Sequence, residues 1–181
     1  MKRIMLIGPG GSGKSTLANE LGKVLKLPVY HLDALHWKPR WVPTPDDEWD
    51  ELQKKLITEE EWIIDGNYGR TIDIRLSKAD TIIFFDFPRW IPIYRVIKRR
   101  IMYHGKTRPD LTDGCPERIS LDFLIWIWNY KRDKRPNILD KFEKVADEKT
   151  LVILRRPLDV IRLIERIKNG VGSFGVGENI L

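Results

Sequence analysis

The sequence predicts an α/β protein built around a mostly parallel β-sheet. Short apolar segments, each long enough for one strand, alternate with stretches whose apolar residues recur at helical spacing. These segments lie near residues 3, 29, 62, 81 and 151. Three of them run into an aspartate: the segments near residues 29, 62 and 81 lead into Asp33, Asp65 and Asp86 respectively. Because parallel strands end at one edge of a sheet, where open α/β folds bind their ligands, we expect the polar chemistry to gather at that edge.

The first apolar segment leads into the run GPGGSGKST, which matches the spacing G-x-x-x-x-G-K-[ST] of a phosphate-binding P-loop. Glycines let successive backbone N–H groups point at one anion, and the following helix adds its unpaired amides and the positive end of its dipole. We expect Lys14 to contact the β- and γ-phosphates of ATP and the Ser15 hydroxyl to ligate Mg²⁺. The predicted cofactor-binding residues are Gly8, Gly10, Gly11, Ser12, Gly13, Lys14, Ser15 and Thr16.

Length and composition favour one compact domain, expected over residues 1–168, because 42% of the 181 residues are hydrophobic. The net charge of +6 suits an anionic ligand and equally a nucleic-acid surface, so it does not decide between them. Too few apolar residues precede Gly8 for a signal peptide, and no apolar run is long enough to span a membrane, so a cytoplasmic protein is expected. The single cysteine, Cys115, excludes an internal disulfide and a cysteine-cluster zinc site.

The phosphoryl acceptor is expected to meet the second strand and the loop after it. Asp33 follows the strand predicted at residues 29–32 and is placed to meet the acceptor, although an Asx turn or a helix cap explains this aspartate equally well. Residues 34–45 are rich in Trp and Pro and are predicted to form an irregular covering or acceptor-binding loop. In this loop His36 and Trp37 either stack on a flat acceptor or pack a small satellite core.

The third strand supplies a second predicted site. Asp65 follows the apolar residues 62–64, and a carboxylate after an apolar strand is what the magnesium-orienting element of a P-loop enzyme requires. A simple Asp-Gly turn is the alternative. Arg70, a few residues further on, is a candidate for pairing with a phosphate or carboxylate of the acceptor.

Pro88 is expected to open a helix whose core-facing stripe consists of Ile93, Ile97 and Ile101. The basic residues of this helix are expected to lie mostly on its other faces. They are Arg95, Lys98, Arg99 and Arg100, the densest cationic patch of the chain, which a solvated helix face also explains.

A loop of altered composition follows. Residues 103–118 combine Gly, Pro and basic residues, including Arg108, and such a loop is typical of a positively charged lid over phosphates. A helical pattern resumes after it, in which Trp126 is expected to serve packing rather than base stacking. A last strand and helix follow, and the glycine-rich residues 169–181 are expected to form a mobile tail.

Several runs of the sequence together resemble those of one known family. They are GPGGSGKSTLA, LDALHW, WIIDGNYGRT, TIIFFDFP and TRPDLTDGCPER followed by FLIWIWNY. With these runs the chain resembles the bacterial DNA topology modulation (FlaR-like) family, a branch of the adenylate-kinase-like P-loop proteins. The resemblance implies a three-layer α/β/α fold of the nucleoside/nucleotide-kinase type, with a five-stranded parallel sheet of order 2-3-1-4-5, ATP as donor, Mg²⁺ and a mobile lid.

The resemblance also implies roles for particular residues. Asp65 and Gly66 with Arg70 look like the Asp-Gly pair and the acceptor-side arginine of adenylate kinases. Arg99 looks like the arginine at the base of the lid, and residues 155–157 would lie near the adenine.

Two functions follow from these features. The leading one is a kinase that transfers the γ-phosphoryl group of MgATP to a small acceptor such as a nucleoside or nucleotide, with Asp33 at the acceptor hydroxyl and Arg99 and Arg108 at the developing charge. The alternative is a nucleotide-regulated DNA-binding or DNA-topology-modulating protein without kinase turnover, whose duplex affinity would fall steeply with salt. The alternative ranks lower because no nucleic-acid-binding motif is visible in the sequence. Neither the acceptor nor the oligomeric state is predicted.

Overall fold

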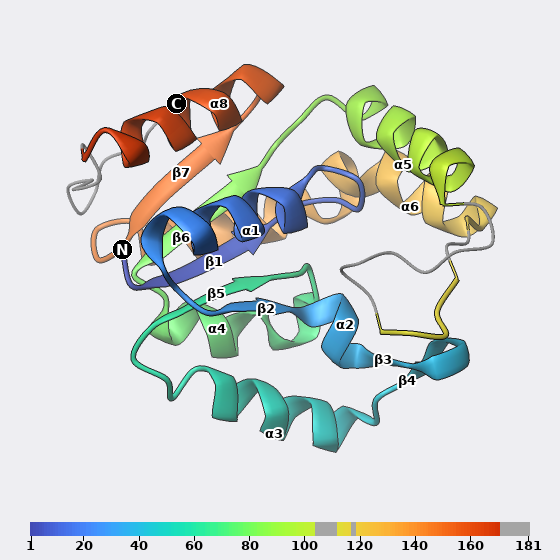
Figure 1. Cartoon of the computed structure of the whole chain (residues 1–181), viewed down its shortest axis with the longest axis horizontal. Coiled ribbons are helices and arrows are strands. Elements are labelled where there is room, and N and C mark those ends of the chain that lie inside the picture. Colours follow the sequence, from blue (N-terminus) through green and yellow to red (C-terminus); the bar gives the residue numbers. More distant parts are fainter. Residues whose placement is uncertain (104–111, 117–118, 171–181) are drawn as a thin grey trace.

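A computed structural model of the chain describes residues 1–103, 112–116 and 119–170 (Figure 1). Arg108 and most of the predicted lid lie outside the described residues. The same holds for residues 171–181 of the predicted tail. Within the described ranges, no helix is both long and apolar enough to cross a membrane.

Five parallel strands form one sheet in the order β2-β5-β1-β6-β7. Their bounds are β1 Arg3–Ile7, β2 Val29–His31, β5 Trp62–Asp65, β6 Thr81–Phe85 and β7 Thr150–Leu154. The labels β3 and β4 belong to a separate hairpin, so the sheet strands counted alone follow the order 2-3-1-4-5. All residues of β5 and β6 are buried, as expected of strands covered on both faces. The predicted fold class is confirmed.

Helices cover both faces of the sheet and complete three layers (Figure 1). On one face, α1 (Lys14–Leu25) and α8 (Pro157–Lys168) pack over Ile4 and Leu6 of β1. On the other face, α3 (Asp46–Leu56), α4 (Ile72–Lys78) and α7 (Arg135–Glu143) pack over Met5 and Ile7. Successive residues of β1 thus alternate between two hydrophobic clusters, as the two-residue period of a strand requires.

The segment predicted as an irregular loop contains short regular elements. They are α2 Leu32–His36, β3 Trp37–Lys38, the 3₁₀ turn η1 Pro39–Trp41 and β4 Val42–Pro43, with a second 3₁₀ turn, η2 Gly69–Thr71, after β5. Arg40 and Trp41 both adopt left-handed backbone angles, with φ of 64° and 62°. Such angles strain residues that carry a Cβ, so the surrounding contacts must hold them in place.

Residues 112–116 supply those contacts, although they lie far away in the sequence. The backbone N–H of Arg40 donates to the Gly114 carbonyl at 2.9 Å, and Trp41 Nε1 donates to the Pro116 carbonyl at 3.1 Å. The buried Cys115 thiol donates to the Lys38 carbonyl at 3.3 Å. Residues 112–116, which lie between α5 (Trp90–Met102) and α6 (Leu121–Asp133), are therefore fastened to the segment that follows α2.

The predicted core-facing stripe of α5 is wrong. Ile97 and Ile101 are 45% and 74% exposed, and the buried residues of the helix are Pro92 and Val96. The reason is that α5 packs against the P-loop: a Cβ at Gly11 would lie 2.6 Å from the Pro92 carbonyl oxygen and from a Val96 methyl group. This contact sets the rotation of the helix and leaves the isoleucines on its outer side.

Candidate active site

A cavity of about 1240 Å³ lies at the carboxyl edge of the sheet. Its walls come from the P-loop, from the ends of β2 and β5, and from α5 and α6. The predicted site residues that line it are Gly10, Gly11, Gly13, Lys14, Ser15, Thr16, Asp33, Trp37, Asp65, Arg70 and Arg99. Gly8, Ser12 and His36 do not line it. The structure therefore brings most of the predicted donor and acceptor residues to one space.

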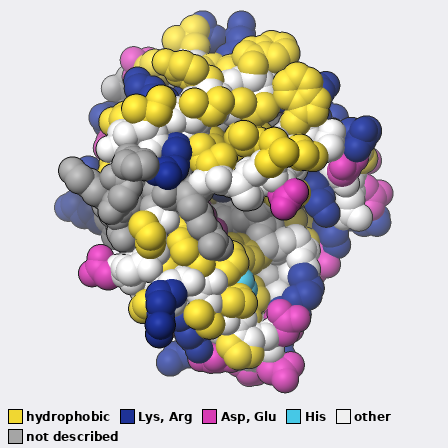
Figure 2. Space-filling view, turned by 90° about the vertical axis from the view of Figure 1, so that its right-hand side faces the viewer, with side chains coloured by type: hydrophobic (Ala, Val, Ile, Leu, Met, Phe, Trp, Pro, Cys, Tyr) yellow, Lys and Arg dark blue, Asp and Glu magenta, His cyan; other side chains and the backbone are white. Residues whose placement is uncertain are grey.

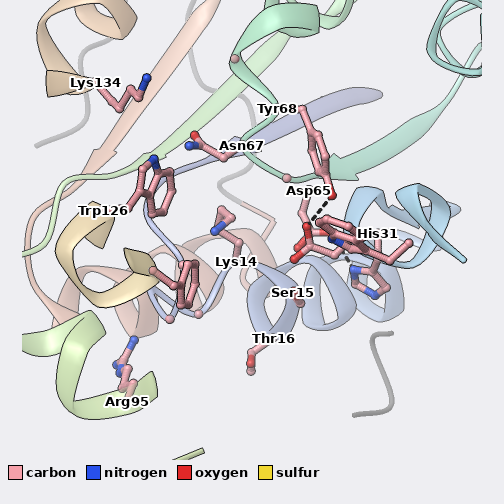
Figure 3. A pocket seen from close by; sticks show the side chains of 18 of the residues that line it. Lys14, Ser15, Thr16, His31, Asp65, Asn67, Tyr68, Arg95, Trp126 and Lys134 are labelled. Carbon is pink, nitrogen blue, oxygen red and sulfur yellow. Dashed lines mark hydrogen bonds and ion pairs between the residues drawn. The ribbon is translucent and has the colours of Figure 1, made fainter. Parts of the chain in front are cut away.

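The P-loop presents an open helix terminus to this cavity. Gly13 caps α1 with a φ of 98°, and no side chain caps the helix or places an acidic group in its first turn. Lys14 Nζ donates to the Pro9 carbonyl at 2.9 Å and lies at the centre of the cavity, between Trp126 and Asp65 (Figure 3). Open amides, a lysine and a positive dipole end fit a polyphosphate.

Asp65 is held in place by a histidine that the sequence analysis did not single out. Oδ1 of the buried Asp65 lies 2.6 Å from Nδ1 of His31, and Nε2 of His31 lies 3.1 Å from Oδ1 of Asn19 (Figure 3). His31 and Asp65 are register partners on β2 and β5, so their side chains leave the sheet on the same side. The strand pairing is the signal that could have identified His31, and it is visible only once the sheet order is known.

The donor groups at this edge fit magnesium better than a metal that needs several protein ligands. Ser15 and Asp65 both line the cavity. Among the described residues, no group of three or more His, Cys, Asp or Glu side chains could hold a metal ion. Mg²⁺ is usually bound by one or two protein oxygens and completes its shell with phosphate oxygens and water, so a hydroxyl and one carboxylate suffice.

Two tyrosines organise the loop after β5. The hydroxyl of Tyr68 donates a hydrogen bond to Asp33 Oδ1 at 2.9 Å. Burial together with the Asp33 charge raises the pKa of Tyr68. Tyr130 of α6 donates to Oδ1 of Asn67 at 3.0 Å, and burial raises its pKa as well. Both tyrosines therefore remain protonated donors, and Asp33 is oriented as an acceptor at the cavity wall.

Arg75 of α4 holds the same loop by hydrogen bonds to its backbone, and this arginine was not predicted as a site residue. Its guanidinium is fully buried and donates to the Gly66 carbonyl at 3.2 Å and to the Tyr68 carbonyl at 3.1 Å. Burial lowers the pKa of Arg75 to about 9. A basic residue in a short helix carries no sequence signal for burial, so only the tertiary structure identifies it.

The other residues predicted at the acceptor lie in two different settings. His36 packs edge-on against Trp37, Trp49 and Tyr68 at centroid distances of 4.9, 4.7 and 4.8 Å, and desolvation lowers its pKa. These contacts match the satellite-core alternative for His36, whereas Trp37 lines the cavity. Arg70 also lines the cavity.

Arg70 is already engaged by carboxylates of α3. Its Nη2 lies 3.1 Å from Oδ1 of Asp46 and 2.8 Å from Oδ1 of Asp50. An acceptor anion at Arg70 must therefore compete with two carboxylates.

The third strand-end aspartate, Asp86, does not belong to the cavity lining. It is 6% exposed, accepts a hydrogen bond from Arg135 Nε at 3.0 Å and lies 3.3 Å from Lys131 Nζ. These ion pairs tie the end of β6 to the junction of α6 and α7, so the contacts of Asp86 are structural.

Helices α5 and α6 place further side chains beside the P-loop. Arg95 lines the cavity with Arg99, and its Nη1 donates to the Ser12 carbonyl at 2.7 Å, while burial lowers its pKa. Phe123 and Trp126 of α6 also line the cavity and stack with their rings 5.9 Å apart and 9° from parallel. The basic residues of α5 were expected mostly on its other faces, but Arg95 and Arg99 line the cavity because the packing of α5 on the P-loop sets its rotation. Trp126 packs against the hydrophobic core, as expected, and also lines the cavity.

The P-loop, the strand order and the carboxylates at the sheet edge define a P-loop protein with the fold of the nucleoside/nucleotide kinases. Among solved structures, a gluconokinase from Sinorhizobium meliloti 1021 is similar over 94% of this chain and 95% of its own, with 18% identity and a TM-score of 0.50. Shikimate kinases are similar as well. The enzyme from Bacteroides thetaiotaomicron aligns over 94% of this chain and 98% of its own, with 16% identity and a TM-score of 0.49.

The shikimate kinase from Aquifex aeolicus aligns over 96% of this chain and 99% of its own, with 19% identity and a TM-score of 0.49. At 18% identity, the likeness to the gluconokinase, with its TM-score of 0.50, supports the fold and not the substrate. No protein-family model and no curated protein sequence matches the chain.

Proposed function

We propose that this chain is a kinase that transfers the γ-phosphoryl group of MgATP to a hydroxyl of a small acceptor, such as a nucleoside or nucleotide. One observation carries the proposal: an uncapped P-loop helix and two carboxylates, Asp33 and Asp65, line a single cavity. A phosphate donor, a metal-orienting group and a proton acceptor are the parts that phosphoryl transfer needs.

The donor half consists of the P-loop and the end of β5. The amides of residues 10–16 and the Lys14 ammonium hold the β- and γ-phosphates. Ser15 and Asp65 hold Mg²⁺, which when bound neutralises phosphate charge, and the His31 contact keeps Asp65 in one orientation. Arg99 and Arg95 lie on the α5 wall, where they stabilise charge that develops on the transferring group.

The acceptor half lies between Asp33 and Arg70. The bond from the γ-phosphorus to the ADP oxygen breaks, a bond to the acceptor oxygen forms, and the hydroxyl proton passes to Asp33. Tyr68 fixes that carboxylate by its hydrogen bond. We assign Trp37 and Arg70 to contact with the acceptor, and His36 to support of Trp37, which it touches edge-on.

The kinase is favoured over the DNA-binding alternative because two arginines of the basic helix, Arg95 and Arg99, line the cavity. A protein that binds duplex phosphates needs such residues on an outer surface. The sequence runs in which the chain resembles the DNA topology modulation family lead us to propose membership of that family. A cytoplasmic location, where ATP is supplied, accords with the kinase proposal.

A screen of nucleosides, nucleotides and sugars with MgATP tests the proposal, with ADP formation and thermal stabilisation as the two readouts. At an ATP concentration about 100 times the dissociation constant, bound ATP stabilises the fold by about 2.7 kcal/mol. Lys14→Ala is expected to abolish this stabilisation without changing the melting temperature of the ligand-free protein. The matched control is Lys23→Ala on the exposed side of α1, which should behave as wild type.

Asp33→Asn separates the two halves of the site. It keeps the shape of the side chain and should retain ATP-dependent stabilisation, while turnover falls by about 10²- to 10⁴-fold, the usual contribution of a general base. The kinase assignment fails if no acceptor raises ADP formation above the rate with MgATP alone.

A further inference from the structure

The outer side of α5 and α6 is a broad apolar surface. The two helices pack together and run antiparallel: the Arg89 guanidinium just before α5 lies 4.6 Å from the ring of Trp128 in the second half of α6. Large hydrophobic side chains, each between 45% and 74% exposed, form what we call the α5–α6 face. They are Trp90, Tyr94, Ile97, Ile101, Met102, Leu121, Ile125 and Trp128. Figure 2 shows hydrophobic side chains gathered at the top of the molecule, where these helices lie.

The spacing of these residues is that of helices that pack on other helices. Seven of the eight recur on α5 at 90, 94, 97 and 101, in steps of four, three and four, and on α6 at 121, 125 and 128, whereas Met102 lies outside this series. This is the a/d spacing of a helix-packing seam. The fold of one copy does not use the seam on α5, because the buried residues of that helix, Pro92 and Val96, lie on its opposite side against the P-loop.

We propose that the α5–α6 face is an interface between two copies of this chain, in which the two helix pairs pack across a two-fold axis as a four-helix bundle. The exposed apolar area of the face is large enough for an interface with a second protein chain. An aromatic side chain has a surface of about 150–250 Å². Combined with the exposed fractions of the eight side chains, this scale gives the face an exposed apolar area on the order of 900 Å² per copy. The largest apolar patch on a typical monomer is only about 300–600 Å², whereas a standard interface buries about 800 Å² per partner.

A second copy suits the face because a two-fold interface requires a surface that is complementary to itself. The seam positions 90–101 of α5 and 121–128 of α6 carry no charge, and Arg132, at the next step of the series on α6, is paired with Asp133, so two such faces meet without burying an unpaired ion. The exposed α5 residue Lys98 lies outside the seam positions, where its charge can remain in water.

The inner sides of the same helices carry Arg95, Arg99, Phe123 and Trp126, which line the cavity. The face and the cavity thus use opposite sides of α5 and α6. The proposal is therefore independent of the proposed function.

Sedimentation velocity of the full chain tests the proposal between about 1 and 100 μM, a range that brackets weak and moderate interfaces. We expect a particle with the mass of two 21.3-kDa chains. The double variant Tyr94→Glu/Ile101→Glu alters two residues that are 65% and 74% exposed, and it should raise the dimer dissociation constant at least about 100-fold. The matched control, Leu158→Glu/Ile161→Glu, adds the same charge to exposed positions of α8 and should leave the dimer intact.

Three results would overturn the proposal: a wild-type monomer at every concentration, a dimer that persists in the α5 variant, or equal dissociation of the α8 control. If the α5 variant melts at a lower temperature than wild type, Leu121→Glu tests the same face from α6, where that side chain is 72% exposed. Wild-type monomer that co-sediments with vesicles of phosphatidylcholine and phosphatidylserine would also refute the dimer and assign the face to a membrane surface.

Discussion

The contact between Gly10 and Phe123 makes a quantitative test of the P-loop packing possible. A Cβ at Gly10 would overlap Cζ of Phe123 and would lie 3.0 Å from Cε2. Carbon atoms in contact normally lie about 3.5–4.0 Å apart, so the ring must give way by about 1 Å. Because Phe123 stacks on Trp126, that movement disturbs a second ring. Overpacking of this kind costs about 1–3 kcal/mol, and we expect Gly10→Ala to lower the free energy of unfolding by about 2 kcal/mol.

A double-mutant cycle isolates the contact. In a Phe123→Ala background the obstacle is gone, so Gly10→Ala should change the free energy of unfolding by less than about 0.5 kcal/mol. Urea denaturation of the four proteins at constant m-value gives the coupling energy. Gly69→Ala is the control, because a Cβ there meets no heavy atom within 4 Å. An equal cost of Gly10→Ala in both backgrounds would show that the clash is not its cause.

Three further predictions concern stability elsewhere in the chain. Lys26 ends α1 with a φ of 59°, so Lys26→Gly should raise the free energy of unfolding by about 0.5–1 kcal/mol in urea denaturation, and a decrease would contradict the strain argument. Asp86→Asn leaves the Arg135 guanidinium facing a neutral amide and should cost about 2 kcal/mol by calorimetry, whereas no loss would mean that the pair is not stabilising. Desolvation lowers the pKa of His36, so between that pKa and the ordinary 6.5 the unfolded chain binds more protons than the native chain, and stability must fall as the pH drops through this window. Urea denaturation from pH 7 to 5 should show a smaller fall in His36→Phe, and equal falls would refute the assignment.

The P-loop side of the candidate site could be predicted from sequence because its signals are local. Gly8 to Ser15 form one contiguous motif, and the apolar strand before it fixes where the loop must lie. Asp65 was placed by the same reasoning, since it ends a buried strand. In each case the residues that matter are neighbours in the chain.

The rest depended on contacts between distant segments. Helix α5 has apolar residues on two sides, and periodicity alone does not say which side is inner; the packing of Val96 on Gly11 decides it. His31 became recognisable only through its pairing with Asp65 across β2 and β5. Arg75 is buried because two carbonyls of the loop before its helix, nine and seven residues away, accept its hydrogen bonds, and no periodicity of side chains reveals how that loop folds back.

The buried Cys115 provides a chemical probe of the contact between residues 112–116 and the segment after α2. Cys115 is the only cysteine in the sequence and is fully buried, with its thiol bonded to the Lys38 carbonyl. A thiol-specific reagent can reach it only when this segment separates from β3 and η1. When separation and closure are fast, the labelling rate divided by that of a free thiol equals the opening constant of the contact. The natural chain therefore reports, without any engineered label, how tightly residues 112–116 hold to the segment after α2, and whether a ligand in the cavity strengthens that contact.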